Sequence, residues 1–164
     1  MYRVLIVDDE PIIRKGLRSI INWKNFDCEV IAEASDGLDG LELVRKHKPD
    51  IIITDIKMPE ADGLSMIKQI KEDVPESKII ILTGHRNFDY AHEAVKLGVT
   101  DFLLKPSRIE ELTAAISRAV KELNFQKQRN EELNKLSHLF NQNISVLREK
   151  LLYDIIYEIN TNPE

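Results

Sequence analysis

Short β-branched runs alternate with segments of helical periodicity over roughly the first three quarters of the chain. The runs are predicted strands, and they lie at 4–7, 29–34, 50–54, 78–82 and 100–104. After each strand, apolar residues recur every three or four positions, which predicts five amphipathic helices. This alternation indicates an α/β fold, a doubly wound five-stranded parallel sheet with helices on both faces and right-handed crossovers. Such folds bind ligands at the carboxyl ends of their strands.

Local signals mark where several of these helices begin and end. The predicted helices cover 11–21, 37–47, 64–70 and 87–97, and a fifth begins at 107. Pro11 suits the first turn of the first helix, and Gly98 ends the fourth. Ser107, with Glu110 three residues later, predicts a capping box at the start of the fifth helix.

The last third of the chain is predicted to be one long amphipathic helix. No glycine follows Gly98, and no proline lies between Pro106 and Pro163. Apolar residues recur there with a mean spacing of about 3.7 residues, which differs from a 3.5-residue heptad seam. They are Leu133, Leu136, Phe140, Ile144, Leu147, Leu151 and Ile155. We expect this face to pack on the domain, on a second copy or on a region outside this sequence. The predicted boundaries are 1–122 for the α/β domain and 123–164 for a helical linker or dimerisation extension.

Charge and cysteine content exclude several classes of protein. The net charge of −5 gives the whole chain no basic signature of a nucleic-acid-binding protein. The single cysteine, Cys28, allows neither an intramolecular disulfide nor a multi-cysteine metal site, and we expect it to be a small buried apolar side chain. The N-terminal apolar run is too short for a signal peptide or a membrane span, so we expect a cytoplasmic protein without membrane contacts.

Polar side chains follow four of the predicted strands, at the edge where such folds bind ligands. They are Asp8, Asp9 and Glu10 after the first strand, Asp55 after the third, Thr83 after the fourth and Lys105 after the fifth. Several carboxylates at one edge repel each other. A bound Mg²⁺, which prefers oxygen ligands, relieves that repulsion. A hydroxyl and an ammonium group can hold phosphoryl oxygens. The sequence therefore predicts a phosphoryl-transfer site that contains a nucleophile, a metal and donors.

Four motifs together resemble the receiver domain of bacterial two-component response regulators. They are "VLIVDDE", "DIIITDIKMPEADG", "IIILTGH" and "DFLLKP", and the resemblance covers about residues 1–122. It implies a flavodoxin-like (βα)5 fold and a conformational switch that controls an output. It also implies that a histidine kinase phosphorylates the chain in a Mg²⁺-dependent reaction. The chain would then be no enzyme, beyond catalysing its own phosphorylation and dephosphorylation.

The resemblance also implies which residues form the phosphorylation site. Asp55 is the phosphoacceptor. Asp9 and Asp55 bind Mg²⁺ through their carboxylates, and Lys57 contributes its backbone carbonyl. Asp8 belongs to the same metal site and often acts through a water. Thr83 and Lys105 hold the phosphoryl group.

Two further expectations concern switching and the lifetime of the phosphoryl group. Phe102 takes the position of a switch aromatic residue, and Thr83 acts with it. Many relatives carry tyrosine where Phe102 stands, so a hydrogen bond from that ring is absent here while its packing role remains. Lys57 and His85 each follow a site residue by two positions, and we expect them to flank the path of an attacking water and to tune dephosphorylation.

A finer resemblance concerns the output. The stretches "IINWKNFDCEVIAEASDG" and "GHRNFDYAHEAVKLGV" are similar to receivers of regulators that carry a C-terminal AraC-type DNA-binding domain. This implies a transcription regulator that contacts DNA only through an output domain absent from these residues, since that domain needs about 100 residues. A homodimer could form through the face of the fourth helix, fifth strand and fifth helix, through the C-terminal helix, or through both.

Three other functions share parts of this pattern. A metal-dependent phosphatase with an aspartate nucleophile usually has a second acid two residues on, where Lys57 stands here. A flavodoxin-type flavin binder needs a phosphate loop after the first strand, where "DDEPII" is acidic and repels phosphate. An interaction module that works without phosphorylation would not need the acid pocket, threonine and lysine.

Overall fold

The computed structural model describes residues 1–59 and 62–161 of the 164-residue chain, and it excludes the side chains of 145, 146 and 154–161. The chain divides into two compact units, Met1–Leu123 and Asn124–Glu164. The predicted apolar position Ile155 therefore falls outside the described side chains, and the last three residues of the predicted extension fall outside the described chain.

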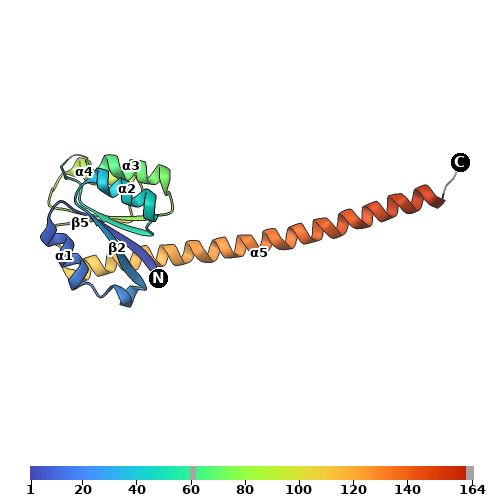
Figure 1. The fold of residues 1–164 in the computed structure, drawn as a ribbon, viewed down its shortest axis with the longest axis horizontal. Coiled ribbons are helices and arrows are strands. Elements are labelled where there is room, and N and C mark those ends of the chain that lie inside the picture. Colours follow the sequence, from blue (N-terminus) through green and yellow to red (C-terminus); the bar gives the residue numbers. More distant parts are fainter. Residues whose placement is uncertain (60–61, 162–164) are drawn as a thin grey trace. The chain divides into compact units, whose positions relative to one another are not determined.

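Five strands and five helices alternate, with a short 3-10 helix after the first helix (Figure 1). The elements are β1 (Tyr2–Val7), α1 (Pro11–Ile20), η1 (Trp23–Phe26), β2 (Cys28–Ala34), α2 (Gly37–His47), β3 (Ile51–Thr54), α3 (Gly63–Asp73), β4 (Lys78–Thr83), α4 (Phe88–Lys96), β5 (Asp101–Leu104) and α5 (Ile109–Thr161). The strands form one sheet of order β2-β1-β3-β4-β5, and every neighbouring pair is parallel. The predicted doubly wound α/β fold is confirmed.

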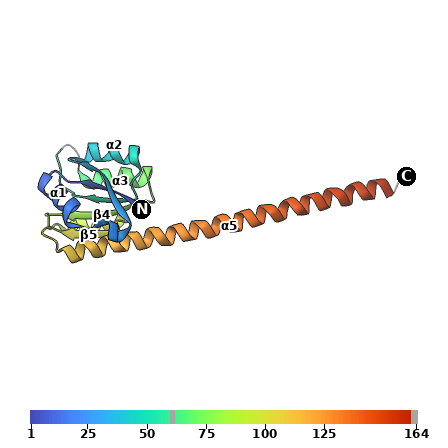
Figure 2. The same cartoon turned by 60° about the horizontal axis from the view of Figure 1, so that its bottom comes forward.

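Consecutive isoleucines of the two central strands pack on opposite faces of the sheet. Ile51, Ile53 and Ile80 belong to a buried cluster with residues of α1 and α5, whereas Ile52 and Ile79 belong to a second cluster with residues of α2 and α3. Figures 1 and 2 show α2 and α3 together on one side of the sheet. A strand whose two faces are both covered needs an unbroken apolar run, which explains the β-branched sequence.

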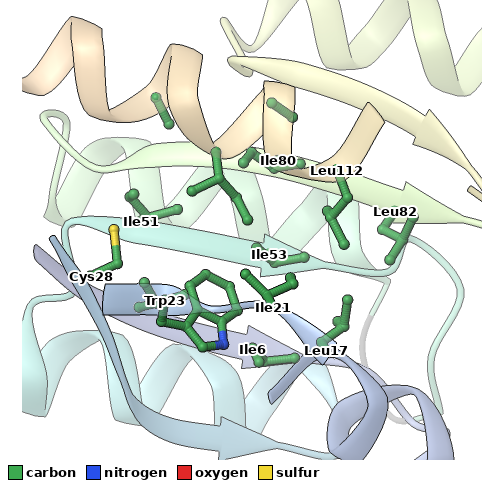
Figure 3. Close-up of a cluster of buried hydrophobic side chains, with 14 of the residues drawn as sticks. Ile6, Leu17, Ile21, Trp23, Cys28, Ile51, Ile53, Ile80, Leu82 and Leu112 are labelled. Carbon is green, nitrogen blue, oxygen red and sulfur yellow. The ribbon is translucent and has the colours of Figure 1, made fainter. Parts of the chain in front are cut away.

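Trp23 and Cys28 complete the cluster on the α1 and α5 side of the sheet (Figure 3). Cys28 is a free, buried cysteine, as the sequence predicted. Burial raises the pKa of its thiol to about 11, with the nearby Asp27 and Asp50 charges adding to the effect. The thiol is therefore protonated at neutral pH and serves as a small apolar side chain.

Polar side chains set the starts of three helices. Asp36, Asp62 and Asn87 cap α2, α3 and α4 by accepting hydrogen bonds from backbone amides in the first turn. The capping box predicted for Ser107 and Glu110 is wrong, because α5 begins at Ile109. Glu111 instead accepts a 3.4 Å bond from the backbone amide of Arg108, so the cap lies one residue further along the chain.

The loop after β3 folds back tightly on the strand end. The amide of Gly63 donates a 2.7 Å hydrogen bond to the carbonyl of Ile56. A Cβ atom at Gly63 would lie 2.3 Å from the carbonyl oxygen of Asp55 and 2.8 Å from the Cα of Ile56. Only glycine allows the start of α3 to approach this closely, and the approach helps to fix the backbone of Asp55.

Helix α5 contributes to both units. Its residues Leu112, Ala115, Ile116, Ala119 and Leu123 are buried in the core of the first unit. Residues 124–161 form a single helix, which confirms the predicted C-terminal helix. In the described chain, no helix combines the length and hydropathy that a membrane crossing requires.

Candidate functional site

Three carboxylates meet at the carboxyl edge of the sheet. Asp8 and Asp9 follow β1 and Asp55 follows β3, and their carboxylate oxygens lie within 4.8 Å of one another. Asp8 and Asp55 are buried, and Asp9 is more accessible. Oxygen ligands grouped in this way suit a hard divalent cation such as Mg²⁺, which would remove their mutual repulsion. These residues therefore fit the predicted metal group.

Lys105 lies among the carboxylates and neutralises part of their charge. Its Nζ is 2.7 Å from Asp8 Oδ2, 2.8 Å from Asp55 Oδ2 and 3.3 Å from Glu10 Oε1. Burial alone would lower the pKa of Lys105, but the hydrogen bonds to Asp55 and Asp8 outweigh burial and raise it. The lysine therefore stays protonated and holds Asp8 and Asp55 together. The Lys105–Pro106 peptide bond is cis.

The two oxygens of Asp55 have different partners. Oδ1 accepts hydrogen bonds from the backbone amides of Ile56 (2.6 Å) and Lys57 (3.4 Å). Oδ2 is bound by the Lys105 ammonium. The backbone of the loop after β3 thus orients the carboxylate through Oδ1, and the lysine contacts the other oxygen.

Thr83 and Lys105 occupy neighbouring strand ends. The amide of Lys105 donates a 2.8 Å bond to the carbonyl of Thr83, and Thr83 is in register with Leu104 of β5. The Thr83 side chain is buried, and its Oγ1 accepts a 3.4 Å bond from the amide of His85. The structure therefore brings Thr83 to the edge of the sheet that carries the carboxylates.

The remaining predicted residues lie around this centre. Phe102 of β5 is partly buried and packs against the cluster that includes Ala94 of α4. Lys57 and His85 are exposed at the rim, on the loops that follow β3 and β4. No side-chain contact joins either of them to Asp55 in the described hydrogen bonds, so their predicted effect on dephosphorylation stays a prediction.

Two side chains support the site through contacts that the sequence did not predict, although Glu10 itself was expected at this edge. Glu10 sits at the N-cap of α1 but makes no capping bond, and its carboxylate turns to Lys105 instead. Arg14, on the first turns of α1, donates a 2.6 Å bond to the backbone carbonyl of Asp8 and pairs with Glu33 at 3.6 Å. No sequence pattern marks Arg14, because only the fold brings it beneath the loop after β1.

The buried carboxyl of Asp8 should make the free energy of unfolding depend on pH. Burial raises its pKa above 3.8, and the charge of Asp55 adds to this, although Lys105 opposes it. A carboxyl with a raised folded-state pKa stabilises the fold below its unfolded pKa and loses that contribution as the pH rises through the folded pKa. Asp8→Asn should therefore raise the free energy of unfolding of the metal-free protein at pH 7.

Urea titrations in EDTA at several pH values measure this effect. The gain from Asp8→Asn should shrink as the pH falls toward 3.8, the ordinary pKa of the carboxyl. Addition of Mg²⁺ should stabilise the wild type more than the variant, because the variant lacks one carboxylate ligand. A gain of equal size at every pH would contradict the assignment of a buried, charged Asp8.

The fold and the grouped acids, lysine and threonine define a class of signalling domain, and comparison with protein families gives the same result. Residues 4–117 match the model of the response regulator receiver domain. The chain belongs to this family: it contains the receiver domain of a two-component response regulator.

Relatives and solved structures agree with this assignment. The chain is 36% identical over 138 residues to the uncharacterized transcriptional regulatory protein YesN of Bacillus subtilis (strain 168), covering 84% of this chain and 38% of that protein. It is also 36% identical over 130 residues to the transcriptional regulatory protein HptR of Staphylococcus aureus (strain N315), covering 79% and 51%. The REC domain of AraT, a response regulator from Geobacillus stearothermophilus, superposes with a TM-score of 0.73 at 41% identity, covering 77% of this chain and 98% of that one. The chain spans about half or less of the length of these curated relatives.

Proposed function

We propose that this receiver accepts a phosphoryl group on Asp55 from a histidine kinase in a Mg²⁺-dependent reaction. The observation that carries the proposal is the buried Asp55 carboxylate, grouped with Asp8 and Asp9 and bound by Lys105. Asp8, Asp9, Asp55 and the carbonyl of Lys57 would hold the metal. A bound Mg²⁺ supplies positive charge that stabilises the transferring phosphoryl group.

The geometry supports a direct role for each neighbouring side chain. A carboxylate oxygen of Asp55 forms a bond to phosphorus while the bond from phosphorus to the kinase histidine nitrogen breaks. The amides of Ile56 and Lys57 keep the carboxylate oriented. Lys105 can then exchange its carboxylate partners for a phosphoryl oxygen, and the Thr83 hydroxyl can donate to another.

Thr83 and Phe102 are the proposed switch. Movement of Thr83 toward the phosphoryl group vacates space at the end of β4, and the partly buried ring of Phe102 on the neighbouring strand can turn toward it. Such a switch biases two existing conformations by about 1–3 kcal/mol. It would alter the face formed by α4, β5 and the start of α5, where Phe88, Val95 and Leu104 are exposed. This face is the proposed surface for a homodimer.

An apolar groove beside the acceptor supports docking of a kinase helix. The groove has a volume of about 640 Å³ and runs between α1 and the loop after β5. Ile12 and Ile20 of α1, which are 76% and 60% exposed, line it together with Pro106 and Ile109. Because Lys105 and Glu10 also line the groove, a helix seated there would lie next to the carboxylate cluster.

The output of the proposed regulator is transcription. The matched relatives are named as transcriptional regulatory proteins. A further similar structure is that of a two-component transcriptional regulator AraC from Clostridium phytofermentans. It superposes with a TM-score of 0.71 at 30% identity and covers 77% of this chain and 98% of that one. We propose that an AraC-type output domain outside these residues contacts DNA, and that the protein acts in the cytoplasm. Catalysis is limited to the chain's own phosphorylation and dephosphorylation. We propose 1–122 as the receiver and 123–164 as the extension that leads to the output.

Intact-mass measurement of the whole chain tests the proposal. The protein is incubated with acetyl phosphate and either Mg²⁺ or EDTA. We expect a gain of one phosphoryl group with Mg²⁺ and no gain with EDTA. Absence of any gain in Mg²⁺, together with no Mg²⁺-dependent binding of beryllofluoride, would show an interaction module that works without phosphorylation.

We expect the side chains of Lys57 and His85 to affect the lifetime of the phosphorylated state. Lys57 and His85 are exposed on the two loops that follow Asp55 and Thr83. We propose that they flank the path of the water that attacks the phosphoryl group. Lys57→Ala and His85→Ala should each change the dephosphorylation rate constant by about threefold or more. Loss of the mass gain after removal of acetyl phosphate measures that rate. Lys68→Ala, an exposed lysine on α3, is the matched control, and equal rates in all variants would contradict the prediction.

A further inference from the structure

Apolar residues on the helix of the second unit follow a repeat of eleven residues. Steps of three, four and four lead from Leu133 through Leu136 and Phe140 to Ile144. The same steps lead from Ile144 through Leu147 and Leu151 to position 155. Eleven residues take three turns at about 3.67 residues per turn, which is close to the natural helical period.

The repeat makes a straight stripe along the helix. At about 100° per residue, the six side chains from Leu133 to Leu151 fall within an arc of about 80°. A heptad repeat drifts by about 20° in each cycle and requires a left-handed supercoil, whereas this stripe keeps one direction with little or slightly right-handed coiling. We call Leu133, Leu136, Phe140, Ile144, Leu147 and Leu151 the seam.

The seam is open to solvent within this chain. Its side chains are 47% to 66% exposed, and none belongs to either buried cluster of the described structure. The same helix carries asparagine at 130, 134, 141 and 143, and asparagine is a poor helix former. A helix of this composition gains most of its stability by burying its apolar face, so the seam needs a partner.

We propose that the seam pairs with the seam of a second copy of this chain. A second copy carries the same eleven-residue spacing, so the two stripes stay in contact along their whole length. Burial of about 100 Å² by each of the six side chains amounts to about 1,200 Å² for the pair of helices, the lower end of the range for stable interfaces. Five basic and four acidic residues lie between 127 and 154, so the two helices do not repel each other.

This pairing is independent of phosphorylation of Asp55 and goes beyond the proposed function. It predicts a reversible dimer of the full chain in the absence of any phosphoryl donor. It also predicts that helicity, followed by circular dichroism at 222 nm, rises with protein concentration, because pairing stabilises the helix.

Sedimentation equilibrium of the unphosphorylated full chain tests the seam with matched variants. Leu147 of the seam is 59% exposed, and Leu139 and Leu152, which lie outside the 80° arc, are 56% and 52% exposed. In a single chain the three replacements by glutamate are equivalent, because each adds the same charge at a similarly exposed position. Only pairing through the seam distinguishes them.

We expect Leu147→Glu to raise the dimer dissociation constant at least about tenfold, and Leu139→Glu and Leu152→Glu to change it by less than about threefold. A wild type that is still monomeric at about 100 µM would overturn the proposal. So would equal effects of all three variants, or a dimer that Leu147→Glu leaves intact, which would place the interface on the receiver. Because all these samples lack a phosphoryl donor, failure here leaves the phosphorylation of Asp55 untouched.

Discussion

Asp55→Asn should abolish the Mg²⁺-dependent gain of a phosphoryl group from acetyl phosphate. The amide oxygen of asparagine can still accept the hydrogen bonds that Ile56 and Lys57 donate to Oδ1, so the loop keeps its conformation. The amide nevertheless provides no anionic oxygen to attack phosphorus. The expected result is a folded variant whose intact mass is unchanged after incubation.

The matched control is Asp50→Asn, at the opposite end of β3. Asp50 accepts a 2.7 Å bond from the amide of Arg3 and lies at the amino end of the strand, away from the carboxylate cluster. This variant should gain one phosphoryl group as the wild type does. A mass gain in Asp55→Asn would identify a different acceptor and would refute the assigned role of Asp55.

Lys105→Ala should destabilise the metal-free protein by about 3 kcal/mol at pH 7, since loss of one partner from a buried ion pair leaves uncompensated charge. The side chains of Asp8 and Asp55 are 3% and 7% exposed, and Lys105 is the cation bound to both. Urea denaturation in EDTA measures the change. Mg²⁺ should restore much of the lost stability, because a divalent cation can replace the missing ammonium.

Lys78→Ala provides the control for removal of a lysine from an ion pair. Lys78 pairs with Glu122 at 3.1 Å, but half of the glutamate side chain is exposed. Loss of such a surface pair should cost less than about 1 kcal/mol, and Mg²⁺ should not reverse it. Equal losses in the two variants, or a loss in Lys105→Ala that Mg²⁺ leaves unchanged, would contradict the role assigned to Lys105.

The residues at the carboxyl edge of the sheet could be predicted because the apolar runs of the sequence locate the ends of the strands. Asp8, Asp55, Thr83 and Lys105 each follow an apolar run, and parallel strands place their carboxyl ends at one edge. The sequence therefore predicted which side chains meet, although Asp8 and Lys105 are 97 positions apart.

The pairings within the site could not be predicted in the same way. The contact of Lys105 with Glu10 depends on a glutamate at the N-cap of α1 that makes no side-chain capping bond and instead contacts a lysine 95 positions away. The support of Asp8 by Arg14 depends on how α1 sits under the loop. The start of α5 was misplaced for a related reason, since Ser107 and Arg108 are alternative cap positions that only the final backbone distinguishes.

The three-way contact of Lys105 gives the resting receiver a counter-ion that belongs to its own chain. A tethered ammonium keeps the same effective concentration at the site however dilute the protein is. A divalent cation at this site would therefore compete with an ammonium group that never diffuses away, and its apparent affinity would be weaker than the three carboxylates alone would give. The same competition would have a useful side, since a lysine that lost carboxylate partners to a cation would become available to a phosphoryl oxygen. Metal binding and readiness to receive a phosphoryl group would thereby be coupled through one side chain.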